Sequence, residues 1–291
     1  MTNYKGIVLA AGRASRLFPI TFAVNKQLLA IYDKPMIYYP LSVLMLSQIK
    51  DILIITKKED LKSFKSLLGN GKKLGIKISY AIQKKPQGIA DAFIIGEKFI
   101  GKSNCALILG DNIFYGQNFT EKLMSAKSKN NGATVFSYPV NDPQRYGVVE
   151  IDKKNNPIRI IEKPKVPKSN LAVTGLYFYD NQIVNIAKSL KPSKRGELEI
   201  TDVNKVYLKR RNLYMESFGR GFAWLDTGTP ESLLTANTFI ANIEQRQGLK
   251  IACLEEISYL NKWISKLDLQ KLTNAMSPGP YKDYLSNLLK K

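Results

Sequence analysis

The chain has 291 residues, 44% hydrophobic and 23% charged, which is typical of a soluble globular protein of one or two domains. Its 44 lysine and arginine residues outnumber 24 acidic residues, and the net charge of +20 predicts an anionic partner. The sequence contains no histidine, which excludes Ser-His-Asp and Cys-His catalysis and the usual zinc sites. Any catalytic metal is therefore expected to be Mg²⁺ held by oxygen ligands.

The distribution of residues disfavours several classes of partner and location. There is no apolar run of about 18 residues, so we expect no membrane span, and the short N-terminal apolar run does not predict a signal peptide. Cys105 and Cys253 lack metal-ligand spacing, which favours reduced thiols in a cytoplasmic protein. The lysines are spread out, and no zinc-finger, RRM or KH signature accompanies them. A phosphate-rich small substrate is favoured over nucleic acid.

Strand and helix patterns alternate in the first half of the chain. Strands are expected at 6–10, 51–56, 76–82 and 105–109, and helices at 36–48, 59–68 and 89–99. Such alternation predicts an α/β fold with a mostly parallel, Rossmann-like sheet flanked by helices on both faces. Ligands of such sheets bind beyond the carboxyl ends of the strands.

The second half has shorter, turn-separated elements. Strands are expected at 133–140, 147–152, 158–162, 172–179 and 213–218, and helices at 196–208 and 231–245. Short helices follow residue 248, with a break at the Ser-Pro-Gly-Pro sequence of 277–280. We therefore expect one α/β domain over 1–240, divided near residue 115, and a helical C-terminal segment over 241–291.

The segment after the first strand has the composition of a phosphate-binding loop. Residues 11–16 read Ala-Gly-Arg-Ala-Ser-Arg, and small side chains leave backbone N–H groups free to cradle an anion. Arg13, Arg16 and Lys26 place three cations around this loop. An ordinary strand-to-helix turn with surface cations would give the same local pattern.

Two aspartates follow predicted strands. Asp111 comes after the strand 105–109, and Asp226 lies in Trp-Leu-Asp-Thr-Gly-Thr before the helix 231–245. Either carboxylate could bind a metal over the sheet edge, or could cap a turn or a helix. Gln83 lies between a strand and a helix, and its amide could pair with the edge of a nucleobase.

Several of these motifs recur together, in order, in a known family. The sequences G-x-x-x-R-L-x-P from Gly12, G-D-N at 110–112, E-K-P at 162–164 and W-x-D-T-G at 224–228 resemble the sugar nucleotidyltransferases, also called sugar-nucleotide pyrophosphorylases. Matches continue to about residue 250. The resemblance implies a GT-A-like nucleotidyltransferase fold, with a nucleotide-binding half over 1–115 and a sugar-binding half over 116–240.

Within the family, the chain is most similar to members that transfer a thymidylyl group from dTTP to α-D-glucose 1-phosphate, releasing pyrophosphate. The resemblance implies catalytic roles for Arg16, Lys26, Lys163 and Asp111, and Mg²⁺ ligands at Asp111 and Asp226. It assigns to the nucleotide Leu9, Ala11, Gly12, Arg13, Ala14, Ser15, Arg16, Gln27, Gln83, Pro86, Gly88 and Asp111. It assigns to the sugar phosphate Tyr146, Gly147, Glu162, Lys163 and Val173.

The resemblance also implies a homotetramer with a regulatory nucleotide site between subunits. It places that site at Tyr115, Gly116, Arg220, Lys250 and Glu256, with oligomer and regulatory contacts in 241–291. Leu260 stands where the family often has arginine, so we expect feedback by dTDP-rhamnose to be weakened.

The chain departs from the usual family pattern within the loops. Ala14 replaces a glycine of the phosphate loop, and a positive φ there would strain an alanine. Ala11, Ala30, Gln87 and Asp91 also differ from the usual residues. The alternatives left open are a related enzyme that uses UTP or another base, and a non-catalytic homologue that binds sugar nucleotides.

Overall fold

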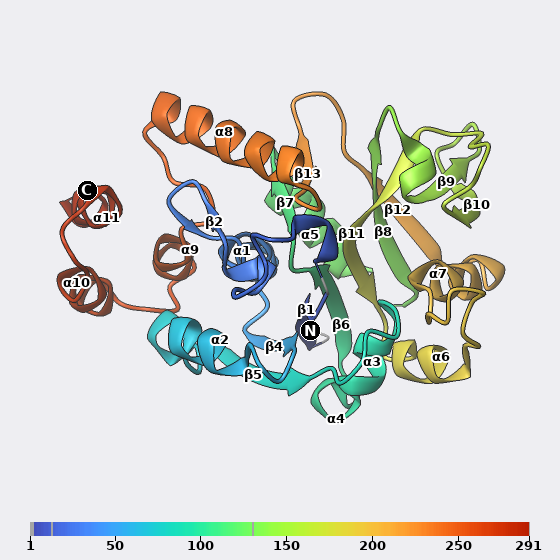
Figure 1. Cartoon of the computed structure of the whole chain (residues 1–291), viewed down its shortest axis with the longest axis horizontal. Helices are drawn as coiled ribbons and strands as arrows, with labels where there is room; N and C mark the ends of the chain where they lie inside the picture. Colours follow the sequence, from blue (N-terminus) through green and yellow to red (C-terminus); the bar gives the residue numbers. More distant parts are fainter. Residues whose placement is uncertain (1–2, 13, 130, 291) are drawn as a thin grey trace.

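A computed structural model describes residues 3–12, 14–129 and 131–290, and one mixed β-sheet runs through its middle (Figure 1). The strands of this sheet are β1 (Tyr4–Ala10), β4 (Asp51–Thr56), β5 (Lys77–Ile82), β6 (Asn104–Leu109), β8 (Ala133–Pro139), β9 (Gly147–Ile151), β10 (Pro157–Glu162), β11 (Leu171–Tyr179) and β12 (Leu213–Ser217). They follow the order β10-β9-β11-β6-β1-β4-β5, and β8 joins β11 to β12.

The direction of the strands changes between the two halves of the sheet. β1 lies between β4 and β6, parallel to both, and β4 is parallel to β5. β11 then pairs antiparallel with β6, and β8, β9 and β10 extend this second part, while β12 runs parallel to β8. The predicted α/β fold is confirmed, with its parallel part confined mainly to the first half of the chain.

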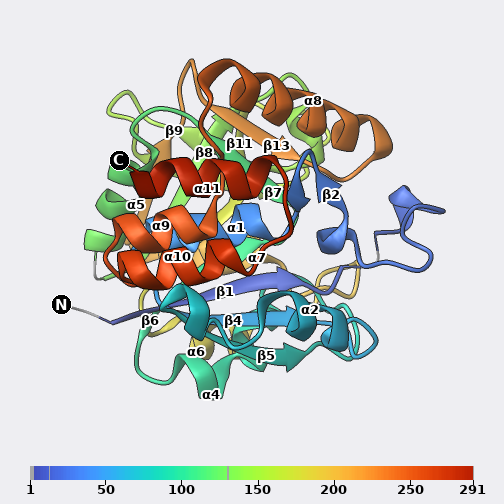
Figure 2. The same cartoon turned by 90° about the vertical axis from the view of Figure 1, so that its left-hand side faces the viewer.

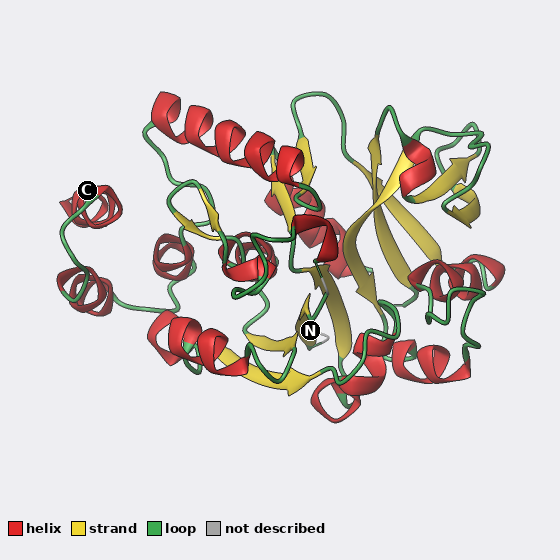
Figure 3. Ribbon diagram, in the orientation of Figure 1, coloured by secondary structure: helices red, strands yellow, loops and turns green. Residues whose placement is uncertain are grey.

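Helices cover both faces of the sheet (Figure 3). They are α1 (Tyr38–Leu46), α2 (Leu61–Leu68), α3 (Asp91–Ile95), α4 (Glu97–Ile100), α5 (Phe119–Ser128), α6 (Ile183–Ser189), α7 (Ile200–Lys209), α8 (Pro230–Gln247), α9 (Leu254–Leu260), α10 (Lys266–Asn274) and α11 (Pro280–Lys290). Short 3₁₀ turns lie at Ser15–Leu17, Lys26–Leu28, Lys72–Leu74 and Pro143–Arg145. Of the helices in the described residues, none is both long and apolar enough to cross a membrane.

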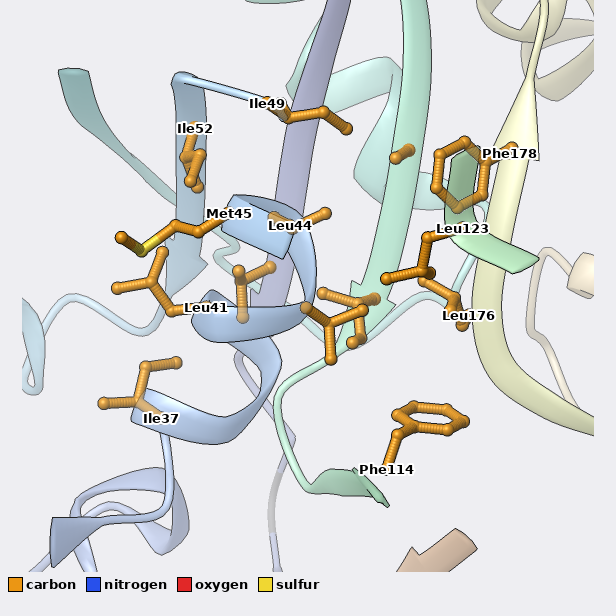
Figure 4. Close-up of a cluster of buried hydrophobic side chains, with 14 of the residues drawn as sticks. Ile37, Leu41, Leu44, Met45, Ile49, Ile52, Phe114, Leu123, Leu176 and Phe178 are labelled. Carbon is orange, nitrogen blue, oxygen red and sulfur yellow. The ribbon is translucent and has the colours of Figure 1, made fainter. Parts of the chain in front are cut away.

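Alternating side chains of the strands build a core on each face. Val8 of β1 is buried with α1 and α5, whereas its neighbour Ile7 is buried with α3, α6 and α7. In the first core, Leu41 of α1 lies on one side of the cluster, and Leu176 lies with Leu123 and Phe178 on the other (Figure 4). The sheet is buried on both faces here, which explains why β1 and its neighbours are continuous apolar runs in the sequence.

Two short ribbons lie outside the main sheet. β7 (Asn112–Tyr115) pairs antiparallel with β13 (Ala223–Asp226), and β2 (Ala30–Ile31) pairs with β3 (Lys34–Pro35). The register of the first ribbon sets Asp226 opposite Asn112. It therefore brings Asp226 beside Asp111, although the two residues are far apart in the sequence.

The last three helices form a small core of their own at one end of the molecule. Cys253, Leu269 and Leu285 are buried together there. Figure 2 shows α9, α10 and α11 stacked in front of α1, and α9 packs against α1. A capping box between Ser265 and Asp268 begins α10. Pro280 is the first residue of α11, at the end of the predicted break.

Some predicted elements differ from the structure. The helix expected at 89–99 is divided at Gly96 into α3 and α4, and the helix expected from Gly196 begins only at Ile200. The delay arises because the Leu198 N–H donates to the Gln87 carbonyl at 2.7 Å, which holds this stretch outside the helix. The ribbons and the helices α5 and α6 were not predicted from the sequence pattern.

Candidate active site

A cleft of about 600 Å³ opens at the carboxyl ends of β1, β5 and β6 and extends to the start of α7. Most of the site residues expected from the sequence line it, although they come from separate segments. These are Leu9, Gly12, Arg16, Gln83, Pro86, Gly88, Asp111, Tyr146, Gly147, Glu162, Lys163, Val173 and Asp226. The fold therefore brings the expected nucleotide and sugar residues into one cavity.

The remaining expected residues either do not line the cleft or lie outside the described residues. Ala11, Ala14, Ser15, Lys26 and Gln27 are not part of the lining. Lys26 is buried, yet its Nζ lies 2.6 Å from Asp111 Oδ2 and so reaches the cleft through that carboxylate. Arg13 lies outside the described residues.

Ala14 adopts the left-handed conformation with positive φ, which the sequence alone could not decide. Its φ is 50° and its ψ is 31°, immediately before the turn Ser15–Leu17. The Ala14 carbonyl accepts hydrogen bonds from the Leu17 N–H at 2.9 Å and from Thr21 Oγ1 at 3.2 Å, which hold the loop in this shape. An alanine in this region costs about 1–2 kcal/mol, because its Cβ crowds the following carbonyl.

The two strand-end aspartates carry opposite pKa shifts. Burial raises the pKa of Asp226, and the negative charge of Asp111 raises it further. Burial would also raise the pKa of Asp111, but the charge and hydrogen bond of Lys26, with a hydrogen bond from Asn112, hold that pKa below its usual value. Asp226 is thus a carboxylate whose surroundings favour an added positive charge.

Cations surround this acidic pair without fully neutralising it. A Cβ built on Gly228 would lie 3.0 Å from Arg16 Nη2, so this glycine lets the guanidinium lie close to Asp226. Arg145 Nη2 is 4.0 Å from Asp226 Oδ2. Within the described residues, no group of three or more Cys, Asp or Glu side chains could hold a metal ion alone.

Glu162 lies at the other end of the cleft and is held in place on two sides. Its Oε2 accepts a 2.6 Å hydrogen bond from Thr201 Oγ1, and its Oε1 lies 3.4 Å from Arg195 Nη2. A Cβ at Gly147 would be 3.1 Å from Thr201 Oγ1 and 3.4 Å from Glu162 Oε2, so glycine permits this approach.

Lys163 follows with a positive φ of 42°, and its N–H donates to the Tyr146 carbonyl at 3.0 Å. The Lys163 side chain is 47% exposed and its Nζ lies 3.9 Å from Glu162 Oε1. The left-handed turn therefore carries a loosely paired cation at the mouth of the cleft. The Lys163 ammonium group is therefore accessible to an anionic ligand in the cleft.

Several lining residues were not among those expected from the sequence. Arg195 and Thr201 enter the cleft from the segment before α7 and from α7 itself, and Arg195 is bound by Glu199 at 2.9 Å. Arg145 and Asn112 also line the cleft. Arg195 lies in a Ser-Lys-Arg-Gly-Glu stretch that resembles any solvated loop, so the sequence carried no signal for it.

Comparisons with known proteins identify the family. A family model described as "Nucleotidyl transferase" matches residues 5–243, well over half of the chain. The chain belongs to this family. This nucleotidyltransferase is 58% identical to a glucose-1-phosphate thymidylyltransferase of Neisseria meningitidis over 99% of this chain and 100% of the relative. It is 49% identical to the Mycobacterium tuberculosis enzyme of the same name, over 99% of each chain.

Solved structures of related enzymes share its fold. A Bacillus anthracis protein assigned as a glucose-1-phosphate thymidylyltransferase and solved with sucrose superimposes with a TM-score of 0.76 at 44% identity, covering 81% of this chain and 94% of that one. A UDP-glucose pyrophosphorylase complexed with UDP-glucose gives a TM-score of 0.73 at 26% identity, covering 84% of this chain and all of the other. The nucleotidyltransferase fold is therefore confirmed.

A second cavity of this nucleotidyltransferase, of about 480 Å³, contains most of the expected regulatory residues. Tyr115, Gly116, Lys250 and Glu256 line it, together with Leu260, whereas Arg220 is not part of the lining. Lys250 is bound by Asp33 and by Glu244 at 2.9 Å. Asp33 and Glu244 also pair with the buried Lys34, so two carboxylates balance two lysines. Leu260 contributes no charge to the cavity.

Proposed function

We propose that this nucleotidyltransferase transfers a thymidylyl group from dTTP to α-D-glucose 1-phosphate and releases dTDP-glucose and pyrophosphate. The observation that carries the proposal is the single cleft in which Arg16, Lys163 and the acidic pair Asp111 and Asp226 converge. The relatives named glucose-1-phosphate thymidylyltransferase, which are similar to this chain over their whole length, support this choice of substrates. We place the reaction in the cytoplasm, where buried free thiols such as Cys105 and Cys253 stay reduced.

The proposed reaction is one in-line displacement at the α-phosphorus of dTTP. A phosphate oxygen of glucose 1-phosphate attacks that phosphorus, and pyrophosphate leaves on the opposite side. The attacking oxygen is already anionic, so no side chain has to remove a proton. The protein contributes position and fixed charge: Arg16 at the β- and γ-phosphates, Lys26 at the α-phosphate and Lys163 at the sugar phosphate.

Glu162 and its neighbours would orient the sugar. Glu162 is already fixed by Thr201, so it can accept hydrogen bonds from sugar hydroxyls without losing further side-chain freedom. Tyr146 lies against Trp224, with ring centroids 5.1 Å apart, and forms a firm wall beside Gly147. This part of the cleft would fix the 1-phosphate near Lys163.

The acidic pair fits a magnesium ion. Asp111 and Asp226 supply hard oxygen ligands, and the raised pKa of Asp226 is what a site for an added cation would produce. Mg²⁺ commonly takes one or two carboxylates and completes its coordination with water and substrate phosphates, so two aspartates suffice. When bound, it would neutralise charge on the phosphate oxygens.

Pyrophosphate release from dTTP tests the proposal directly. Purified protein with dTTP, glucose 1-phosphate and Mg²⁺ should release pyrophosphate, and omission of any one component should stop the reaction. UTP should be assayed beside dTTP, because the structure is also similar to a UDP-glucose pyrophosphorylase. No release with dTTP would overturn the proposal. Release with UTP alone would favour the UTP-using alternative, and no release with either nucleotide would favour an enzyme for another base or a non-catalytic binding protein.

Ala14→Gly is expected to lower the KM for dTTP several-fold and to leave the KM for glucose 1-phosphate nearly unchanged. Glycine reaches φ near 50° without a Cβ clash, so a larger fraction of the free protein should hold the loop ready for the nucleotide. Steady-state kinetics with each substrate varied in turn provide the measurement. An unchanged or higher KM for dTTP would mean that alanine is harmless at this position.

We also propose a homotetramer with weak feedback control through the second cavity. Lys250 is held in an ion-pair network with Asp33 and Glu244, and Leu260 stands where the family often has arginine, so dTDP-rhamnose is expected to inhibit only at high concentration. Light scattering would give the oligomeric state, and inhibition curves for wild type and Leu260→Arg would give the strength of feedback. Strong inhibition of the wild type would contradict the weakening, and the arginine variant should be the more sensitive protein.

A further inference from the structure

A buried pair of side chains lies behind the nucleotide end of the cleft. Gln83, directly after β5, is 6% exposed, and Asp91, the first residue of α3, is 7% exposed. Gln83 Nε2 donates a 2.8 Å hydrogen bond to Asp91 Oδ2. Gln83 lines the cleft, whereas Asp91 is not part of the lining. Asp91 can therefore reach a ligand only through the amide of Gln83.

The loop between the two residues is fixed to another part of the chain. Leu198 donates from its N–H to the Gln87 carbonyl at 2.7 Å and accepts from the Ala90 N–H at 3.2 Å. Gly88 has a φ of 99°, and a Cβ there would lie 2.4 Å from the Leu198 carbonyl oxygen. Gln83 and Asp91 thus lie at the two ends of a cleft-lining loop that is hydrogen-bonded to Leu198.

The chemistry of the pair fixes which way the amide points. An ionised carboxylate accepts hydrogen bonds and has none to donate, so the NH₂ group of Gln83 must face Asp91. The reversed amide would set its oxygen against the carboxylate in a buried place, which is strongly unfavourable. The carbonyl oxygen Oε1 is then held away from Asp91, as an acceptor for whatever occupies the cleft.

We infer that Asp91 is a positioning residue that holds the Gln83 carbonyl toward the nucleobase and so selects bases that carry a ring N–H. Thymine and uracil carry an N3–H donor on the Watson–Crick edge, which could donate to Gln83 Oε1. Cytosine has an unprotonated N3 acceptor at the same position, so its lone pair would repel the lone pairs of Oε1. The inference rests on the proposed function, in which this end of the cleft receives the base of a nucleoside triphosphate. A site that expects a donor rejects a base that lacks one, because a buried acceptor is left unpaired.

Asp91→Asn tests the orientation without removing the side chain. An asparagine amide can pair with Gln83 in either direction, so the Gln83 amide is free to turn its NH₂ toward the cleft. Isothermal titration calorimetry should measure dTTP and dCTP binding to wild type and variant in the absence of sugar phosphate. The preference for dTTP over dCTP is expected to fall about tenfold or more in the variant, chiefly through tighter dCTP binding.

The double variant Gln83→Glu with Asp91→Asn provides the rescue. The introduced asparagine amide would donate to one oxygen of the introduced glutamate, and the other carboxylate oxygen would again face the base as an acceptor. The preference for dTTP should return toward the wild-type value. An effect of Asp91 on folding alone would not be reversed by this exchange of donor and acceptor.

Asp283→Asn is the matched control, because Asp283 also lies in the first turn of a helix but is exposed on α11. It should leave the preference unchanged. An unchanged preference in Asp91→Asn, or a double variant no better than Asp91→Asn, would overturn the inference. Wild-type protein that binds dTTP but releases no pyrophosphate would instead count against the proposed reaction alone.

Discussion

Asp226→Asn is expected to lower turnover with dTTP and glucose 1-phosphate by two to three orders of magnitude, roughly the loss found when one preorganised charge contact is removed from an active site. The Asp226→Asn variant should fold normally. Burial and Asp111 raise the pKa of Asp226, so its ionised form is destabilising in the folded protein at neutral pH. A neutral amide of the same shape removes that cost, and thermal unfolding should show equal or greater stability.

Asp111→Asn should lose as much activity but behave differently in stability. Asp111 is the close partner of Lys26, which is only 6% exposed, and the variant would leave that lysine buried without its counter-charge. Its lowered pKa means that the ionised carboxylate stabilises the fold above its ordinary titration range, and the variant forfeits this stabilisation. Urea denaturation should therefore separate the two variants.

Turnover, unfolding and Mg²⁺ binding should be measured in parallel for both aspartate variants, with exposed Asp283→Asn as the control. Calorimetric titration with Mg²⁺ gives a readout that does not depend on catalysis. Weakened Mg²⁺ binding in both variants is expected. Nearly normal Mg²⁺-dependent turnover in both would show that the pair does not hold the metal.

Elements with a strong local pattern could be predicted from the sequence. β4 occupies the predicted residues 51–56. A run of branched apolar side chains between two polar ends is typical of a strand buried in a parallel sheet. The ribbon of β7 and β13 could not be predicted in this way. Its strands are four residues long and pair across more than a hundred residues, so the pairing depends on tertiary structure.

The site residues also divide into those that lie in local sequence motifs and those that only the tertiary structure brings into the cleft. Loop residues such as Arg16 and Gln83 sit in recognisable motifs at strand ends, and the structure places both in the cleft. Arg195 and Thr201 have no motif, and they enter the cleft because α7 packs beside β10. The conformation of Ala14 was open in the sequence, since only the hydrogen bonds of the folded loop fix its positive φ.

Arg16→Ala and Lys163→Ala are expected to damage the use of different substrates. Arg16 lies at the phosphate loop beside Gly228 and the acidic pair, whereas Lys163 lies on the left-handed turn after β10, next to Glu162. A hydrogen bond to a charged group contributes about 1.5–3 kcal/mol, which corresponds to a factor of about 10 to 150. Arg16→Ala should raise the KM for dTTP by such a factor, and Lys163→Ala the KM for glucose 1-phosphate.

Each variant should also lower kcat, because the charge on both phosphates rearranges in the transition state and the lost cation stabilised it there. Lys165→Ala is a matched control, since Lys165 is an exposed lysine two residues beyond Lys163 that does not line the cleft. It should leave both KM values unchanged. The decisive comparison is the cross-effect: if Arg16→Ala and Lys163→Ala raised the two KM values equally, the cleft would not divide into a triphosphate end and a sugar-phosphate end. Unequal effects in the predicted directions would instead assign each cation to one phosphate.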